Sequence, residues 1–252
     1  MNKNEILSYI FYPRESFSVR DEKDILVNVE AGVDVGIRLF LKDRNLPTII
    51  YFHGNAELSQ EYDSIAEIYN DYDMNIIVAD YRGYGLSGGY PNKDNLHSDS
   101  IKIFDYIKFY LKDNKYIGDV IVMGRSLGSA SACEIIFKRE DDISKCIIES
   151  GFGTEYPLFN LLGVNPNSLD FSIKDGFMNL EKIKKYKKPI YFIHSDHDHI
   201  VPLSEAELML SKSTSKEKDL YIVRNANHNN IIMTAKDIYF QKIKDFIYNE
   251  SS

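Results

Sequence analysis

The chain has 252 residues, of which 44% are hydrophobic and 27% are charged, and this balance excludes a disordered or fibrous protein. Its formal net charge of −8 would repel a polyphosphate backbone, so nucleic acid is not expected as a partner. The first 18 residues lack a secretory pattern, and no uninterrupted apolar window could cross a membrane. We therefore expect a single domain over residues 1–252, cytoplasmic and without stable membrane insertion.

An antiparallel hairpin is the first element predicted along the chain. Residues 25–30 and 35–41 read as strands around a short turn, and we place this hairpin at a sheet edge. Six nearly all-apolar runs follow, as is typical of parallel strands buried on both faces. These predicted strands cover residues 48–52, 75–79, 120–123, 145–148, 190–193 and 220–223.

Stretches with helical spacing alternate with these strands. Apolar side chains recur at helical intervals over residues 62–69 and 103–111. Further helices are expected from Ser126, from near Leu203, and after Asn230 towards the C-terminus. Strands that alternate with helices predict an α/β fold, with a doubly wound and mostly parallel sheet of about eight strands.

The segment 151–179 fits neither rhythm and lies between two predicted strands. It is rich in Gly, Asn, Pro and aromatic residues, and at about 30 residues it is longer than most connecting loops. Such long loops tend to be functional, so we interpret it as a short lid inserted in the domain.

Ser126 lies at the centre of Gly124-Arg125-Ser126-Leu127-Gly128, a G-x-S-x-G motif between a predicted strand and a predicted helix. The turn is so tight that residues two positions on either side must be small, which explains the two glycines. The serine also precedes a helix N-terminus, which favours the negative charge that develops in acyl transfer. This context predicts a nucleophile.

A hydroxyl needs a base to remove its proton at neutral pH, and histidine is suited to that role. In sheets that carry this serine turn, the partners follow in chain order as an acid and then a histidine. The candidates after Ser126 are His194, His197, His199 and His228. His228 is the best, because it follows the last predicted strand in the loop that leads to the final helix.

Three acids could orient the histidine. Asp196 and Asp198 follow the strand at 190–193, and Glu149 follows the strand before it. The stretch 194–199, which contains His194, Asp196, His197, Asp198 and His199, raises the alternative of a metal site. Neighbouring residues on one turn cannot all face a single ion, so we expect neither a metal nor another cofactor.

Two loops flank the predicted serine turn. Asn55, two residues after His53, and Leu127 are expected to donate backbone N–H groups to an oxyanion. His53 is expected to brace its loop. The glycine-rich stretch 80–89 lacks both phosphate-binding patterns, and we interpret it as a structural turn beside the site.

Together these motifs resemble the α/β-hydrolase superfamily, and within it small-lidded serine hydrolases related to protein depalmitoylases and bacterial esterases. The resemblance rests on residues 51–56, 80–87, 124–128, 198–202 and 226–229. It implies that Ser126, Asp198 and His228 form the catalytic triad, since Asp198 stands four residues before Pro202 as in the family pattern. The family usually has glycine where Ser195 and Ser129 stand here, which affects the expected pocket shape.

The expected activity is cleavage of a carboxylic ester or thioester, on a small-molecule or acylated substrate, through an acyl-enzyme. Aromatic residues in the segment 151–179 favour an apolar acyl chain. Three alternatives stay open: a serine peptidase on the same triad, a metallohydrolase, and a non-catalytic binding protein of the same fold.

Overall fold

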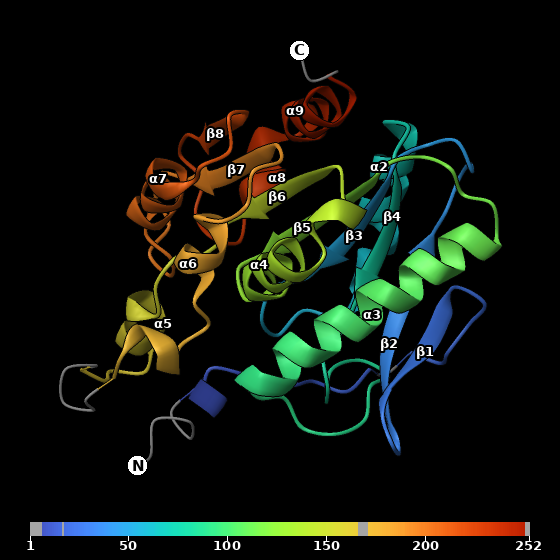
Figure 1. Cartoon of the computed structure of the whole chain (residues 1–252), viewed down its shortest axis with the longest axis horizontal. Coiled ribbons are helices and arrows are strands. Elements are labelled where there is room, and N and C mark those ends of the chain that lie inside the picture. The colour runs from blue at the N-terminus through green and yellow to red at the C-terminus, as the bar shows by residue number, and fades with distance from the viewer. Residues whose placement is uncertain (1–6, 17, 166–170, 250–252) are drawn as a thin grey trace.

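Eight strands form a single sheet in the order β1-β2-β4-β3-β5-β6-β7-β8 (Figure 1). This computed structural model describes residues 7–16, 18–165 and 171–249. Strands β3 to β8 are parallel, whereas β2 pairs antiparallel with both β1 and β4. The strands are β1 (Asp24–Glu30), β2 (Val33–Phe40), β3 (Thr48–Phe52), β4 (Asn75–Ala79), β5 (Val120–Arg125), β6 (Lys145–Glu149), β7 (Ile190–Ser195) and β8 (Lys218–Val223).

Helices cover both faces of the sheet, as a doubly wound layout requires. Helices α3 (Lys93–Asp113), α4 (Gly128–Lys138) and α7 (Leu203–Lys212) contribute to one core, in which Phe104 is fully buried. Helices α2 (Asp63–Asp71), α8 (Ile231–Ala235) and α9 (Asp237–Tyr248) contribute to the other core, which contains Tyr69 and Phe240. Figure 1 shows α3 and α4 in front of the sheet. The predicted α/β fold class, edge hairpin and all six central strands are confirmed.

Two helix boundaries differ from the prediction. The stretch after Asn230 contains two helices, α8 and α9, because Lys236 between them has a φ of 49°, which no right-handed helix can adopt. Helix α4 begins at Gly128 and not at Ser126, because Ser126 itself has a φ of 50°. None of the helices in the described ranges is long and apolar enough to cross a membrane.

The segment between β6 and β7 contains short helices that the sequence pattern does not indicate. These are α5 (Tyr156–Leu161), the 3-10 turn η4 (Ile173–Asp175) and α6 (Asn179–Ile183), each too short to show a repeating apolar face. Further 3-10 turns are η1 (Ser59–Tyr62) and η2 (Glu140–Asp142). Residues 166–170 of the predicted lid lie outside the described residues.

Two carboxylates hold this segment in place. Glu205 of α7 accepts hydrogen bonds from the N–H groups of Gly153 at 2.9 Å and Thr154 at 2.8 Å. Glu155 accepts one from the Phe177 N–H at 2.5 Å. The free backbone donors of an irregular segment are thus satisfied by side chains instead of a ladder.

Two glycines allow α4 to begin against the ends of β3 and β5. A Cβ atom on Gly128 would collide with the carbonyl oxygen of Phe52, and one on Gly124 would collide with the carbonyl of Gly128. Both obstacles are backbone atoms, which cannot rotate away as a side chain can. The close approach therefore depends on the absence of both side chains.

Replacing Gly128 with alanine should therefore lower the free energy of unfolding by about 1–3 kcal/mol, the usual range for overpacking in a close-packed site. Urea denaturation measures the change. The matched control is Gly88→Ala, because a Cβ there would meet only the Asp34 carbonyl at 4.0 Å. Equal stability of the two variants would contradict this account of the turn.

Candidate active site

Four loops that follow parallel strands meet at one edge of the sheet. Asn55 follows β3, Ser126 follows β5, Asp198 follows β7 and His228 follows β8. Since β3 pairs with β5 and β7 pairs with β8 in parallel, the carboxyl ends of all these strands lie at the same edge. In open α/β sheets this is the edge at which ligands bind.

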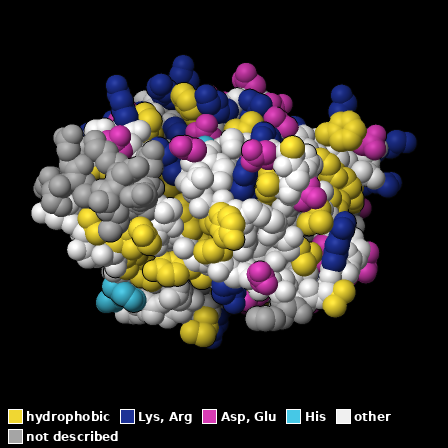
Figure 2. All heavy atoms as spheres, turned by 90° about the horizontal axis from the view of Figure 1, so that it is seen from below, with side chains coloured by type: hydrophobic (Ala, Val, Ile, Leu, Met, Phe, Trp, Pro, Cys, Tyr) yellow, Lys and Arg dark blue, Asp and Glu magenta, His cyan; other side chains and the backbone are white. Residues whose placement is uncertain are grey.

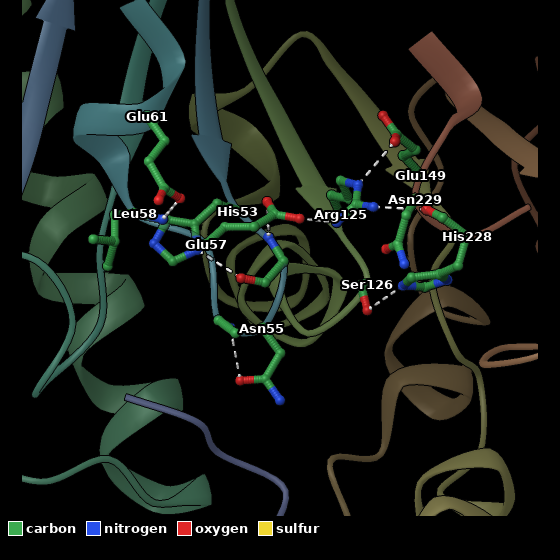
Figure 3. A network of polar contacts seen from close by, with 12 residues as sticks. His53, Asn55, Glu57, Leu58, Glu61, Arg125, Ser126, Glu149, His228 and Asn229 are labelled. Carbon is green, nitrogen blue, oxygen red and sulfur yellow. Dashed lines mark hydrogen bonds and ion pairs between the residues drawn. The ribbon is translucent and has the colours of Figure 1, made fainter. Parts of the chain in front are cut away.

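The imidazole of His228 lies between Ser126 and Asp198. Its Nε2 atom is 3.0 Å from Ser126 Oγ, and its Nδ1 atom is 2.7 Å from Asp198 Oδ2. Figure 3 shows the serine side chain directed at the imidazole. Because a carboxylate can only accept, Nδ1 carries the proton and Nε2 accepts from the serine hydroxyl. The structure therefore joins three side chains that are far apart in the sequence.

Asp198 is buried and hydrogen-bonded through both oxygens. Its Oδ1 atom accepts the N–H groups of Ile200 at 3.0 Å and Val201 at 2.8 Å, while Oδ2 faces His228. Burial alone would raise the pKa of this carboxyl group, but the contact with His228 and the Val201 N–H outweigh burial and hold it below its ordinary value. The group stays ionised at neutral pH, as an acid that orients an imidazole must.

The two other candidate acids have different partners. Asp196 Oδ1 lies 2.8 Å from Nδ1 of the exposed His197 and accepts the Asn225 N–H at 2.8 Å. Glu149 accepts from Arg125 Nε at 3.2 Å and from the hydroxyl of Tyr239. Among the described residues, Asp198 is thus the one of the three acids whose side chain contacts the imidazole of His228.

His194 lies beside Asp198 in the buried end of β7. Its Nε2 atom is 2.8 Å from the Val201 carbonyl oxygen, and burial lowers its pKa. Its Nδ1 atom has no hydrogen-bond partner in the described structure. No group of three or more His, Cys, Asp or Glu side chains arranged to hold a metal ion occurs in the described part of the chain. Within the 194–199 stretch, the imidazole of His194 lies 3.5 Å from Asp198 Oδ2.

Hydrogen bonds of the Asn55 side chain hold the candidate oxyanion loop in place. The Asn55 side chain accepts hydrogen bonds from the Tyr12 N–H at 3.0 Å and the Tyr84 hydroxyl at 2.6 Å, and donates to the Ile10 carbonyl at 2.5 Å. Leu127 precedes helix α4 and directly follows Ser126. The N–H groups of Asn55 and Leu127 therefore start from loops on the neighbouring strands β3 and β5.

Two of the residues that hold the candidate oxyanion loop were not predicted from the sequence. Residues Ile10 and Tyr12 belong to an N-terminal stretch with no motif, and a contact across 45 residues leaves no local signal. The 80–89 turn contributes Tyr84, and its Tyr81 hydroxyl donates to the His53 carbonyl at 2.5 Å. This turn is beside the site, where we expected it.

His53 is fully buried and contacts the 80–89 turn. Its Nε2 atom lies 2.9 Å from Asp80 Oδ1, and its Nδ1 atom lies 2.7 Å from the Gly54 carbonyl oxygen. Burial alone would lower the pKa of His53, but Asp80 outweighs it and raises the pKa. Asp80 also accepts the Ser59 N–H at 2.9 Å and the Ser59 hydroxyl at 2.7 Å. The imidazole therefore bridges the loops after β3 and β4.

Known proteins from several organisms resemble this chain. A family model described as serine aminopeptidase, S33, matches residues 44–159. Protein bem46 of Schizosaccharomyces pombe is 29% identical over 204 residues, which cover 80% of this chain and 67% of bem46. Human α/β hydrolase domain-containing protein 17C is 27% identical over 205 residues, 81% of this chain and 58% of the relative. The chain thus spans less than two thirds of the latter protein.

Solved structures show the same architecture. An esterase from Pyrococcus furiosus, Pf2001, superposes with a TM-score of 0.73 at 16% identity and covers 94% of this chain and 96% of its own. The chain has the α/β-hydrolase fold and is similar in sequence to α/β-hydrolase proteins. Est1E from Butyrivibrio proteoclasticus also shares the α/β-hydrolase fold, with a TM-score of 0.69 at 16% identity over 89% of this chain and 97% of its own.

The lowered pKa of Asp198 predicts how stability depends on pH. A carboxyl group with a lowered folded pKa contributes stability that is fully present above its unfolded pKa of about 3.9 and is lost as the pH falls through the folded value. The stability difference between the wild type and Asp198→Asn should therefore shrink as the pH is lowered below about 3.9. Urea unfolding at a series of pH values tests this, and a difference that grows there would contradict it.

Proposed function

We propose that this α/β-hydrolase cleaves a carboxylic ester or thioester through an acyl-enzyme, with Ser126 as the nucleophile. The observation that supports the proposal is the His228 imidazole, placed 3.0 Å from Ser126 Oγ and 2.7 Å from Asp198 Oδ2. These contacts have the donor and acceptor order that proton removal from a serine requires.

In the proposed reaction, Ser126 Oγ attacks the carbonyl carbon while its proton passes to His228 Nε2. Asp198 stabilises the imidazolium that forms and keeps Nδ1 protonated throughout. The imidazolium then gives its proton to the departing alcohol or thiol, which leaves as the acyl-enzyme forms. Water attacks the acyl group by the reverse route, and the acid and the free serine result.

We place the oxyanion at the backbone N–H groups of Asn55 and Leu127. Donors fixed before the reaction stabilise the negative charge without reorganisation, and each is worth about 10² to 10³ in rate. Since the side chain of Asn55 is held by Tyr12, Tyr84 and Ile10, its backbone is fixed in advance.

An apolar acyl chain fits the segment after β6. A cavity of about 180 Å³ is lined there by Phe159, Phe171, Ile173, Met178 and Leu180, together with six other residues between Gly153 and Glu181. Ser126, Asp198 and His228 are not among its lining residues. Its first lining residue, Gly153, comes three residues after Ser150, in the segment that leaves the sheet at the same edge as Ser126. We propose that the cavity receives the far end of the acyl chain.

The face that contains this segment also exposes hydrophobic side chains. Figure 2, seen from below Figure 1, shows them gathered in patches between polar areas. Tyr156 and Leu161 of α5, the helix at the lower left of Figure 1, and Tyr12 of the N-terminal stretch are each more than half exposed. An apolar approach favours a lipid-like acyl group over a charged substrate.

A peptidase on the same three residues is the second candidate, favoured by the match of residues 44–159 to the serine aminopeptidase model. Ester and amide substrates with the same acyl part separate the two activities. Turnover of the amide at a rate similar to the ester would favour the peptidase. A non-catalytic protein would turn over neither.

Ser126→Ala should abolish labelling by a fluorophosphonate and lower kcat on short p-nitrophenyl esters by about 10⁶-fold, as in hydrolases that lose this nucleophile. Ser131→Ala is the matched control, because Ser131 is buried in the following helix and its hydroxyl has no partner in the described structure. Labelling of Ser126→Ala equal to the wild type would refute the assignment.

Leu180→Trp should reduce the cavity and make the enzyme selective for short acyl chains. We expect kcat/KM for p-nitrophenyl palmitate to fall by about 10-fold or more, since each methylene in an apolar pocket is worth about 10-fold or more. The acetate should be hydrolysed as by the wild type. Ile117→Trp, at a residue 76% exposed outside the segment 151–179, is the control. An equal loss of kcat/KM on both esters would show that the acyl chain binds elsewhere.

A further inference from the structure

Arg125, directly before Ser126, has a nearly buried side chain that contacts three other segments (Figure 3). Its Nη1 atom forms an ion pair with Glu57 Oε1, and its Nε atom lies 3.2 Å from Glu149 Oε1. Its Nη2 atom donates to the backbone carbonyl of His228 at 2.7 Å. One planar guanidinium therefore links the loop after β3, the end of β6 and the loop after β8 next to the serine.

The contact with Glu57 reaches the candidate oxyanion loop. Glu57 Oε2 accepts the Gly54 N–H at 2.9 Å and the Tyr62 hydroxyl at 2.5 Å. Gly54 immediately precedes Asn55, so a shift of the Glu57 carboxylate would move the peptide that carries the proposed oxyanion donor. The position of this loop is therefore tied to the guanidinium through two consecutive contacts.

Arg125 also restrains the base, His228, through a hydrogen bond to the backbone of that residue. A hydrogen bond to the His228 carbonyl limits rotation of the loop after β8 and so limits where the imidazole can lie. Glu149 completes the arrangement, since its backbone carbonyl accepts the Ser126 N–H at 2.9 Å while its side chain holds Arg125. The nucleophile, the base and the oxyanion loop thus share one cation.

The carboxylates around Arg125 keep its guanidinium charged. Burial alone would lower the pKa of Arg125, but Glu57 and Glu149 outweigh it and raise the pKa. Burial likewise would raise the pKa of Glu57, but attraction to Arg125 outweighs it and lowers that pKa. Both groups are therefore charged at neutral pH, and the ion pair persists across the range in which a serine hydrolase works.

We propose that Arg125 is a positioning residue of the proposed hydrolase, and that its guanidinium sets the distance between the oxyanion loop and His228 around Ser126. The inference rests on the proposed function. Arginine suits the role because its rigid fork donates in several fixed directions at once, whereas the ammonium of lysine is a point charge on a flexible chain. Arg125 touches no reacting atom, so its effect is on geometry.

A purely structural role would predict a different outcome, and Arg38 provides the comparison. Arg38 is also buried and also pairs with carboxylates, Asp21, Asp24 and Asp63, at 2.9, 2.8 and 2.7 Å. It lies on β2, and its acceptors belong to the hairpin, the chain before it and helix α2. Removing either arginine leaves one buried carboxylate, Asp24 or Glu149, without its ion-pair partner, but the loss of Arg125 alone disturbs the loops around Ser126.

The test compares Arg125→Met, Arg125→Lys and Arg38→Met in the full chain. Steady-state hydrolysis of p-nitrophenyl acetate is measured well below the Tm of every variant. We expect Arg125→Met to lower kcat by about 10²-fold, the effect of a misplacement of about 1 Å, with KM changed much less. Arg125→Lys should be intermediate, and Arg38→Met should lose stability but keep its kcat.

Chemical rescue provides a second readout that stability alone would not change. Glu57, Arg125 and Glu149 line a cavity of about 390 Å³ on the surface of the protein. Added guanidinium at millimolar concentration should enter it in Arg125→Ala and restore part of kcat, whereas sodium chloride at equal ionic strength should not. If Arg125→Met fails to fold, Glu57→Gln tests the same link, and its kcat should fall while KM is kept.

Wild-type kcat in the Arg125 variants, or an equal loss of kcat in Arg38→Met, would overturn the inference. Absence of rescue combined with a loss of kcat that follows the Tm would also overturn it. If the wild type itself neither hydrolyses esters nor reacts with a fluorophosphonate, the proposed function fails first and the positioning role fails with it. The two failures are therefore distinguishable in one set of assays.

Discussion

The packing of α4 against the ends of β3 and β5 is the constraint on which the rest of the site depends. Without side chains at Gly124 and Gly128, the chain turns from strand to helix so sharply that Ser126 adopts a φ of 50° and projects from the edge. Strain of this kind persists only where the surroundings determine it fully. Here the Ser126 N–H is held by the Glu149 carbonyl of the neighbouring strand.

Around this turn, the sheet edge holds titratable side chains in hydrogen-bonded pairs. His53 pairs with Asp80, Arg125 with Glu57, and His228 with Asp198, and each pair joins loops from different strands. A buried ion pair adds little net stability, because the cost of removing two charges from water offsets their attraction. What such pairs do supply is a defined separation between loops, and that is what a reaction between fixed atoms requires.

The strands and the serine turn could be predicted from the sequence because their signals are local. The six central strands are nearly all apolar since both faces are covered, and the two glycines mark the turn by themselves. Contacts between distant segments left no such signal. The hydrogen bonds from Asn55 to the N-terminal stretch and the short helices α5 and α6 depend on tertiary partners that no periodicity indicates.

Glu149 illustrates why sequence position alone could not choose among the acids. It ends a strand at the correct edge, but Arg125 and Tyr239 occupy its oxygens, and burial raises its pKa in spite of Arg125. Asp198 has the opposite environment, in which His228 and the Val201 N–H lower the pKa. As the pH falls, Glu149 is protonated before Asp198. Environments that separate the pKa values of two nearby acids also separate their roles, and the one that remains ionised is the one able to stabilise an imidazolium.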